Sequence, residues 1–214
     1  ILLSLVGSEM CIRDRIKPLH DAFCVKHINV CTYQAVSGSG KDGVEELLQQ
    51  SSAYIDQRSI DKKVYPKQIA FNSIPFVDCF LENNYTREEM KMVWETHKIL
   101  DKNISVNPTA VRVPVLVGHA ESIYVETEKE IDIEIAKNCL NEFAGISVID
   151  DVQEVDFPTS FEHGHGTDDV YVGRIRKGLS KNNSLNLWVV ADNVRKGAAL
   201  NSIQIAENLV GSEM

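Results

Sequence analysis

The sequence lacks several features that mark common classes of protein. Its apolar first residues, Ile1–Val6, are too short to cross a membrane and lack the basic residues that open a signal peptide. Its net charge of −9 is spread along the chain, with no basic block to neutralise the phosphates of a nucleic acid. We therefore expect neither a membrane nor a nucleic acid as a partner.

Paired cysteines are also missing. The five cysteines are irregularly spaced without a Cys-x-x-Cys pair, and they are Cys11, Cys24, Cys31, Cys79 and Cys139. This pattern excludes a disulfide framework and gives no sign of a zinc site. His163 and His165 could share a metal ion, but their Gly/Thr/Asp loop offers no third ligand. We expect a protein of a reducing compartment, the cytoplasm, with no bound metal.

The two ends of the chain share a hexapeptide. Leu5–Met10 recurs residue for residue as Leu209–Met214, and nothing between the copies resembles them, as a repeat architecture would require. We interpret both ends as foreign, since residues 3–15 resemble a translated sequencing adapter. The composition, 43% hydrophobic and 25% charged, is that of an ordinary globular protein. The expected organisation is one domain at 16–208 between non-native segments at 1–15 and 209–214.

Hydrophobic periodicity predicts an irregular mixture of strands and helices. It predicts strands near 26–33, 111–117, 123–127, 146–149, 170–175 and 185–191, and helices from residue 44, at 87–100, near 136–143 and at 198–209. Thr86 and Glu89 match a capping box. Residues 51–68 and 69–80 are expected to form a surface connection and an irregular buried segment. Because strands and helices do not alternate one to one, we expect an α+β fold with a mixed or antiparallel sheet and helices on one face.

Two polar residues at the ends of an apolar stretch are candidates for chemistry. Arg112 and His119 are separated by an odd number of residues, which in a regular strand points side chains to opposite faces. A bend near Gly118 would have to turn His119 toward Arg112. A strand arginine is more often a rim or ion-pair residue, so these two residues alone leave both interpretations open.

Two further groups are ambiguous in the same way. Glu88 and Lys91 share one face of the capped helix, where a solvated ion pair is the commoner arrangement. Gln34 precedes the turn Ser37–Gly40, whose small residues permit close backbone approach to a ligand. We do not interpret this turn as the Gly-x-Gly-x-x-Gly fingerprint of a dinucleotide-binding loop, and no P-loop is present.

The combination of motifs is more specific than any one of them. In order, the chain contains Tyr33-Gln34-Ala35-Val36-Ser37-Gly38-Ser39-Gly40, Ile69–Pro75, Glu88–Met92 with Glu95–Leu100, Val111–Val115 with Gly118–Ser122, and Val172–Arg176 followed by Asp192-Asn193. This order resembles that of the aspartate-semialdehyde dehydrogenases, from about Ile16 to Asn208. The resemblance implies a domain like the C-terminal catalytic domain of glyceraldehyde-3-phosphate dehydrogenase. In the family this domain follows an NADP-binding Rossmann domain, which we expect this chain to lack.

The resemblance also implies an activity and the residues that carry it. The family reduces L-aspartyl 4-phosphate with NADPH to L-aspartate 4-semialdehyde, a step toward lysine, threonine, methionine and isoleucine, through a thioester on a cysteine. The implied roles are general acid and base for His119, the substrate carboxylate for Arg112, the substrate ammonium for Glu88, phosphate for Lys91 and the acyl group for Gln34, with Ser37, Gly38 and Asn193 approaching the cofactor. A histidine with its ordinary pKa of about 6.5 would suit this proton exchange at neutral pH.

The nucleophilic cysteine is the point of departure from the family. Counting back from Gln34 by the family's spacing reaches Gly7, inside the segment interpreted as foreign. Cys11 lies in that same segment and is not interpreted as a substitute. We therefore expect the chain as printed to be catalytically inactive, while its sheet keeps the family's subunit interface in a homodimer or homotetramer.

Two other interpretations stay open from the sequence. A related acyl-phosphate reductase, such as N-acetyl-glutamyl-phosphate reductase, or a non-phosphorylating aldehyde dehydrogenase would share the two-domain plan. A non-catalytic dimerisation module belongs to a different class and would bind neither NADPH nor aspartyl phosphate. The Glu88, Lys91 and Arg112 side chains favour a substrate that carries ammonium, phosphate and carboxylate groups.

Overall fold

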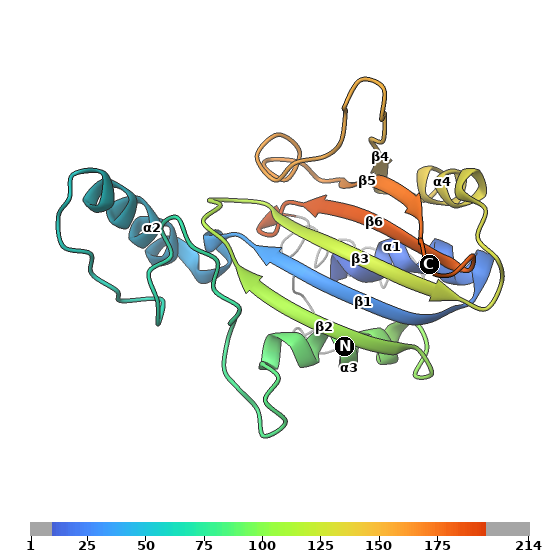
Figure 1. Ribbon diagram of the computed structural model, residues 1–214, viewed down its shortest axis with the longest axis horizontal. Helices are drawn as coiled ribbons and strands as arrows, with labels where there is room; N and C mark the ends of the chain where they lie inside the picture. Colours follow the sequence, from blue (N-terminus) through green and yellow to red (C-terminus); the bar gives the residue numbers. More distant parts are fainter. Residues whose placement is uncertain (1–9, 196–214) are drawn as a thin grey trace, which may run out of the picture.

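The computed structural model describes residues 10–195, and side chains from Ile16 onward. A six-stranded mixed sheet forms its centre, with the spatial order β2-β1-β3-β6-β5-β4 (Figure 1). The strands are β1 Val25–Gln34, β2 Ser105–Arg112, β3 His119–Thr127, β4 Ile146–Val148, β5 Val170–Lys177 and β6 Ser184–Ala191. The β1–β2 and β4–β5 pairs are parallel and the other three pairs antiparallel.

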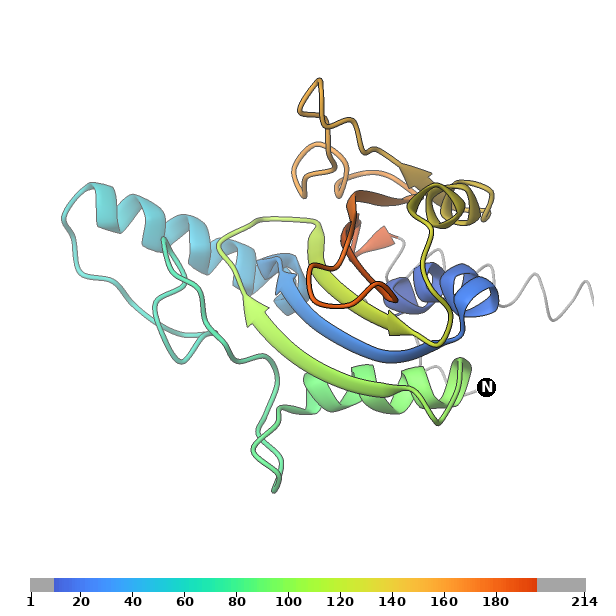
Figure 2. The same cartoon turned by 45° about the vertical axis from the view of Figure 1, so that its right-hand side comes forward.

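Helices cover one face of this sheet. The helices on this face are α1 Met10–Phe23, α3 Arg87–Ile99 and α4 Ile133–Asn141, whereas α2 Gly40–Ile55 follows β1 after a short 3-10 turn at Val36–Ser39. Helices α1, α3 and α4 lie behind the sheet in Figure 1, while α2 projects beyond its end, as Figure 2 also shows. The expected α+β fold, with a mixed sheet and helices on one face, is confirmed. Within residues 10–195, no helix is both long and apolar enough to cross a membrane.

The alternation of each strand separates two faces. On β1, Ile28 and Val30 are buried and join a core with Ile16 and Leu19 of α1. The intervening side chains, such as Tyr33, are only partly buried because no described helix covers them. One face of the sheet is therefore a helix-covered core, and the other is an open surface.

Two predicted helices form with the expected end signals. Helix α3 begins with a capping box in which Thr86 accepts a hydrogen bond from the Glu89 amide, and the Glu89 carboxylate accepts one from the Thr86 amide. Helix α4 is capped by the Asp132 side chain, and Gly145 follows it with φ 81°. The predictions of a capped helix from Arg87 and of a second amphipathic helix are confirmed.

Three expectations about elements need correction. The strand expected at 111–117 lies instead at β2, because Pro114 cannot continue a strand ladder, whereas Pro108 is tolerated on β2 at the edge of the sheet. Residues 51–55 belong to α2 rather than to a surface connection. Helix α1 was not expected, and it contains Pro18.

The ends of the chain bear on two further expectations. Helix α1 begins at Met10, so it runs through the expected boundary between residues 15 and 16. The helix expected at 198–209 and the hexapeptide at 209–214 lie outside the described residues.

Candidate active site

Three neighbouring strands place Arg112, Gln34 and His119 in one row. Gln34 pairs with Arg112 in the β1–β2 ladder, and Tyr33 pairs with Ala120 in the β1–β3 ladder, so His119 lies beside Gln34. All three side chains are on the core face and are nearly inaccessible, with exposures of 6%, 3% and 6% in the order given. A row of polar groups buried at the end of an apolar sheet is costly unless its members are hydrogen bonded.

The connection from β2 to β3 turns His119 onto the same face as Arg112. Strands β2 and β3 flank β1, so residues 113–118 cross its end. The crossing is fixed by hydrogen bonds from the Val36 and Ser37 amides to the carbonyls of Val115 and Leu116. Gly118, with φ 90°, then supplies a backbone conformation that other residues adopt only with strain. The bend anticipated from the odd separation is therefore present.

Ala35, the residue after β1, connects the Arg112 guanidinium and the His119 imidazole. The Arg112 guanidinium donates from Nη1 to the Ala35 carbonyl oxygen at 2.6 Å, and the Ala35 amide donates to His119 Nδ1 at 3.1 Å. A neutral imidazole that accepts at Nδ1 carries its proton on Nε2. Gly38 lies against both groups, because a Cβ on it would come within 2.9 Å of Arg112 Nη1 and 3.4 Å of His119 Nε2.

Glu88 links this row to helix α3. Its Oε1 accepts from Gln34 Nε2 at 3.0 Å, and its Oε2 is 3.0 Å from Lys91 Nζ. The Glu88 side chain is 11% exposed and that of Lys91 is 39% exposed. The ion pair is therefore anchored at its buried end and open to solvent at its cationic end.

Asn193 joins the two turns that border the cluster. Its Oδ1 accepts from the Gly118 amide at 3.0 Å and lies 3.1 Å from Ser37 Oγ, and its Nδ2 lies 3.0 Å from the same oxygen. The turn after β1 and the turn before β3 are thus tied through one side-chain amide. The structure brings together all eight residues singled out from the sequence, which are Gln34, Ser37, Gly38, Glu88, Lys91, Arg112, His119 and Asn193.

The electrostatics of the row differ from the expectation for His119. Burial, and then the positive charge of Arg112, lower its pKa from 6.5 to about 3, against a smaller opposing effect of Glu88. The expectation of an ordinary pKa is therefore wrong for this chain, where the imidazole is neutral at pH 7. Burial also lowers the pKa of Arg112, while nearby Tyr65 and Glu88 oppose the shift.

The glycines after β1 have the Gly-x-Gly-x-x-Gly spacing at 38, 40 and 43, between a strand and a helix. In dinucleotide-binding folds this spacing belongs to a compact strand–helix–strand unit. Here α2 leads away from the sheet, and the parallel partner strand β2 begins only at Ser105. Gly43 instead makes room for the hydroxyl of Tyr65. Tyr65 was not singled out from the sequence, and the only signal near it is the glycine that faces it.

No cluster of three or more His, Cys, Asp and Glu side chains suited to a metal ion occurs in the part of the chain that the structure describes. His163 instead accepts a hydrogen bond from the Thr159 amide and lies in a tilted contact with Tyr171, with ring centroids 5.2 Å apart.

Comparisons with known proteins show which proteins this chain is similar to. The chain is 55% identical over 196 residues to the aspartate-semialdehyde dehydrogenase of Shewanella violacea, covering 91% of this chain and 57% of that protein. Its structure is similar to Vibrio cholerae aspartate semialdehyde dehydrogenase II complexed with ASA, with a TM-score of 0.93, 48% identity, and coverage of 97% of this chain and 61% of that one. It also resembles the Candida albicans enzyme with NADP, with a TM-score of 0.67, 25% identity, and coverage of 94% and 55%.

The chain thus spans somewhat more than half the length of these relatives. The model of the semialdehyde dehydrogenase dimerisation domain matches residues 16–196, which include every residue of the cluster. The chain therefore belongs to the semialdehyde dehydrogenase dimerisation-domain family.

Proposed function

We propose that this chain is the catalytic and dimerisation part of a cytoplasmic aspartate-semialdehyde dehydrogenase, which reduces L-aspartyl 4-phosphate to L-aspartate 4-semialdehyde with NADPH. The observation that carries the proposal is the row Arg112–Gln34–His119, completed by Glu88 and Lys91 at one end of the sheet. No observation favours an N-acetyl-glutamyl-phosphate reductase, or a module that only dimerises.

Arg112 and the Glu88–Lys91 pair supply the charges that the substrate needs. The Arg112 guanidinium uses one Nη1 hydrogen bond on Ala35, and its remaining donors suit the bidentate pairing of a carboxylate. Glu88 suits an ammonium group through its carboxylate. Lys91, exposed at its charged end, suits a phosphate as a mobile point charge. Gln34 is held by Glu88, and its amide then faces the acyl group between the two anchors.

His119 is a neutral hydrogen-bond donor before substrate binds. Its Nδ1 is occupied by the Ala35 amide, so Nε2–H is the group that can reach a reacting oxygen or sulfur. An anion bound beside Arg112 offsets the positive charge that helps to lower the pKa of His119, and so moves that pKa toward neutrality. Substrate binding thereby prepares the imidazole for proton exchange.

NADP fits the described residues at its nicotinamide end. Gly38 leaves open a space beside Arg112 and His119 that a Cβ would fill. Ser37 and Asn193, hydrogen bonded to each other, border this space. When bound, NADPH supplies a hydride to the acyl carbon. The described residues contribute the orienting amides and hydroxyl, and the helical connection between their parallel strands β1 and β2, which runs from residue 35 to 104, is not the compact unit that holds the rest of a dinucleotide.

The nucleophile is proposed to come from outside the residues described. Cys31 is three residues from Gln34 on β1 and therefore faces the open side of the sheet, opposite the row. Cys24 precedes β1 and lies roughly 30 Å from Gln34 at the ordinary rise of a strand. Cys79 and Cys139 make no hydrogen bond with the cluster in the part of the chain described. We expect the chain as printed to show no turnover by itself.

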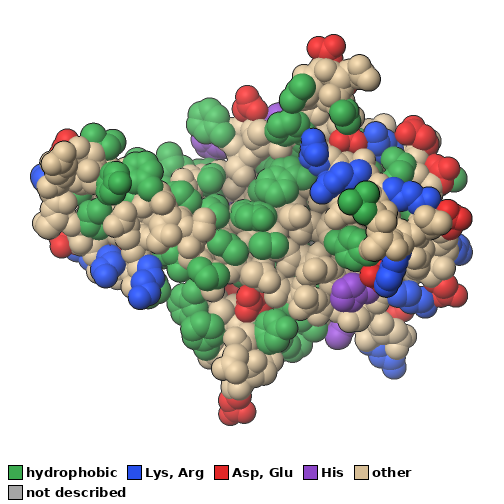
Figure 3. All heavy atoms as spheres, in the orientation of Figure 1, with side chains coloured by type: hydrophobic (Ala, Val, Ile, Leu, Met, Phe, Trp, Pro, Cys, Tyr) green, Lys and Arg blue, Asp and Glu red, His purple; other side chains and the backbone are tan. Residues whose placement is uncertain are grey.

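The open face of the sheet is proposed as the subunit interface. Tyr33 and Trp188 lie on this face with ring centroids 5.5 Å apart, and apolar side chains are spread over the sheet in Figure 3. A sheet face left without helices in a single chain needs cover, and a second copy supplies it in a homodimer or homotetramer.

The test has two parts. The full-length enzyme that contains these residues should reduce NADP in the presence of aspartate semialdehyde and phosphate, and Arg112→Lys should lower its kcat/KM by at least about tenfold because one point charge replaces a bidentate fork. Residues 16–208 alone should show no turnover and should sediment as a dimer or tetramer. A full-length enzyme that is inactive with aspartate semialdehyde would contradict the proposed substrate, and a clean monomer would contradict the interface.

A further inference from the structure

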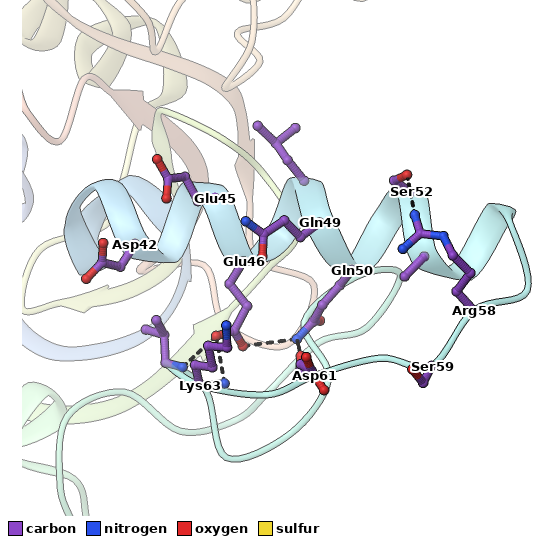
Figure 4. Close-up of a pocket in the computed structure, with 13 residues that line it drawn as sticks. Asp42, Glu45, Glu46, Gln49, Gln50, Ser52, Arg58, Ser59, Asp61 and Lys63 are labelled. Carbon is purple, nitrogen blue, oxygen red and sulfur yellow. Dashed lines mark hydrogen bonds between the residues drawn. The ribbon is translucent and has the colours of Figure 1, made fainter.

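Two buried polar side chains of helix α2 form hydrogen bonds with the segment that follows the helix. Glu46, 6% exposed, accepts hydrogen bonds from the consecutive amides of Lys63 and Val64, with a longer contact to the Tyr65 amide. Gln50, one turn later, donates to Glu46 and to the Asp61 carbonyl (Figure 4). Its Oε1 accepts from the amides of Ile69 and Ala70. Both ends of the 61–70 segment are therefore fixed to α2.

A cavity of about 810 Å³ lies between α2 and residues 58–64, and Glu46 and Gln50 line it (Figure 4). The segment is held beside this space by their hydrogen bonds and by the packing of Tyr65 and Ile69 against Val36 and Leu47. Glu46 and Gln50 thereby help to fix the position of Tyr65.

The chain that follows α2 meets the cluster at two residues, Tyr65 and Ile74. Ile74 exchanges backbone hydrogen bonds with Arg112, at 2.9 and 2.8 Å, and so fixes the Arg112 backbone. Tyr65, 8% exposed, packs with Val36 and Ile74, and its hydroxyl lies 3.4 Å from the Val36 carbonyl. That hydroxyl occupies space left by Gly43, where a Cβ would come within 2.6 Å of it.

Tyr65 is also an electrostatic neighbour of the Arg112 guanidinium. Burial lowers the pKa of Arg112, and Tyr65 opposes this shift, as Glu88 also does. The two side chains are linked through the turn, because Arg112 Nη1 donates to the Ala35 carbonyl and the Tyr65 hydroxyl lies 3.4 Å from the carbonyl of the next residue, Val36.

We propose that Tyr65 is a positioning residue, held by Glu46 and Gln50, that fixes the Arg112 guanidinium and the Val36–Gly38 turn in the geometry that receives the substrate carboxylate. This inference rests on the proposed function. Tyr65 acts through Arg112, so it sets the affinity for the carboxylate while leaving the chemical step to other groups.

The kinetic test uses the full-length enzyme and the variant Tyr65→Phe, which removes only the hydroxyl. We expect the KM for aspartate semialdehyde to rise about fivefold, the typical effect of one lost hydrogen bond, with kcat and the KM for NADP unchanged. Gly43→Ala, whose Cβ would come within 2.6 Å of the hydroxyl and 2.8 Å of the Val36 carbonyl oxygen and Ser39 Cβ, disturbs the same contact and should also raise the KM. A merely structural role would lower the active fraction, and hence kcat, or the melting temperature, with KM unchanged; that result would overturn the proposal.

Tyr85→Phe is the matched control. Its hydroxyl also makes a 3.4 Å contact, to Asn107 Oδ1, but at the exposed edge of the sheet. Its KM should match that of the unsubstituted enzyme. An equal rise in KM for Tyr85→Phe would show that loss of any tyrosine hydroxyl suffices, and would overturn the specific role of Tyr65.

A second measurement separates this inference from the proposed function. On the chain as printed, ¹⁵N NMR of the arginine side chains reports rotation of the Arg112 guanidinium, which Tyr65→Phe and Gly43→Ala should accelerate several-fold and Tyr85→Phe should not. If the unsubstituted full-length enzyme is inactive, the proposed function is contradicted, but the NMR measurement still tests the role of Tyr65. Unchanged rotation in both Tyr65→Phe and Gly43→Ala would overturn the inference whatever the activity.

Discussion

The buried, neutral state of His119 predicts a specific loss of stability in mild acid. As the pH falls below 6.5, His119 takes up a proton in the unfolded chain, whereas the folded chain resists protonation until its pKa of about 3. The stabilisation is thus complete above pH 6.5 and is lost as the pH falls. Each pH unit in this window costs about 1.4 kcal/mol, so at pH 5 the cost is about 2 kcal/mol.

The variant His119→Asn isolates this effect from the other titrating groups. An asparagine Oδ1 can still accept the Ala35 hydrogen bond that His119 Nδ1 accepts at 3.1 Å, but the amide does not titrate. Urea unfolding at pH 7 and pH 5 should therefore show that the unsubstituted chain loses about 2 kcal/mol more than the variant. His27→Asn, at a partly buried position on β1, controls for loss of an imidazole. Parallel losses in the unsubstituted chain and His119→Asn would refute the assignment of a neutral, buried imidazole.

Three further predictions follow from single contacts. Gly38→Ala should lower kcat/KM of the full-length enzyme by about tenfold with little loss of stability, since its Cβ would press on Arg112 Nη1 at 2.9 Å; steady-state kinetics and urea unfolding check both parts. Gln50→Leu should destabilise the chain by about 3 kcal/mol, because it leaves buried backbone amides without an acceptor, and urea unfolding measures this. Thr86→Ala should cost about 1 kcal/mol by removing the cap of α3, whereas a change near zero would show that Glu89 caps the helix unaided.

Local signals predicted most of the fold. The capping box at Thr86 and the apolar face of α4 are set by neighbouring residues, and both helices formed where these signals placed them. The position of β2 could not be predicted in this way. Pro108 usually marks a strand's end, and only its place at the edge of the sheet, a property of the whole topology, makes it compatible with β2.

The candidate site likewise has features that neighbouring residues determine and features that depend on the whole fold. The bend at Gly118 and the shared face of Glu88 and Lys91 follow from local rules, whereas the convergence of these residues was to be expected only from the order of the family motifs. The pKa of His119 could not, because it depends on burial beneath segments distant in sequence and on Arg112 in another strand. The role of Tyr65 could not be predicted either, because its contact with Val36 joins residues that are 29 positions apart in the sequence.

The charges of the cluster suit the anionic substrate that we propose. The chain carries a net charge of −9, whereas the cluster itself holds two cations, Arg112 and Lys91, one carboxylate, Glu88, and a neutral His119. Its local charge is therefore +1, in a place where burial strengthens each interaction. If His119 kept an ordinary pKa, its partial protonation would add repulsion to Arg112 before any substrate arrived. Because burial, and then Arg112, keep the imidazole neutral, the Arg112 guanidinium is the one charged group of the row Arg112–Gln34–His119 and meets no like charge from His119.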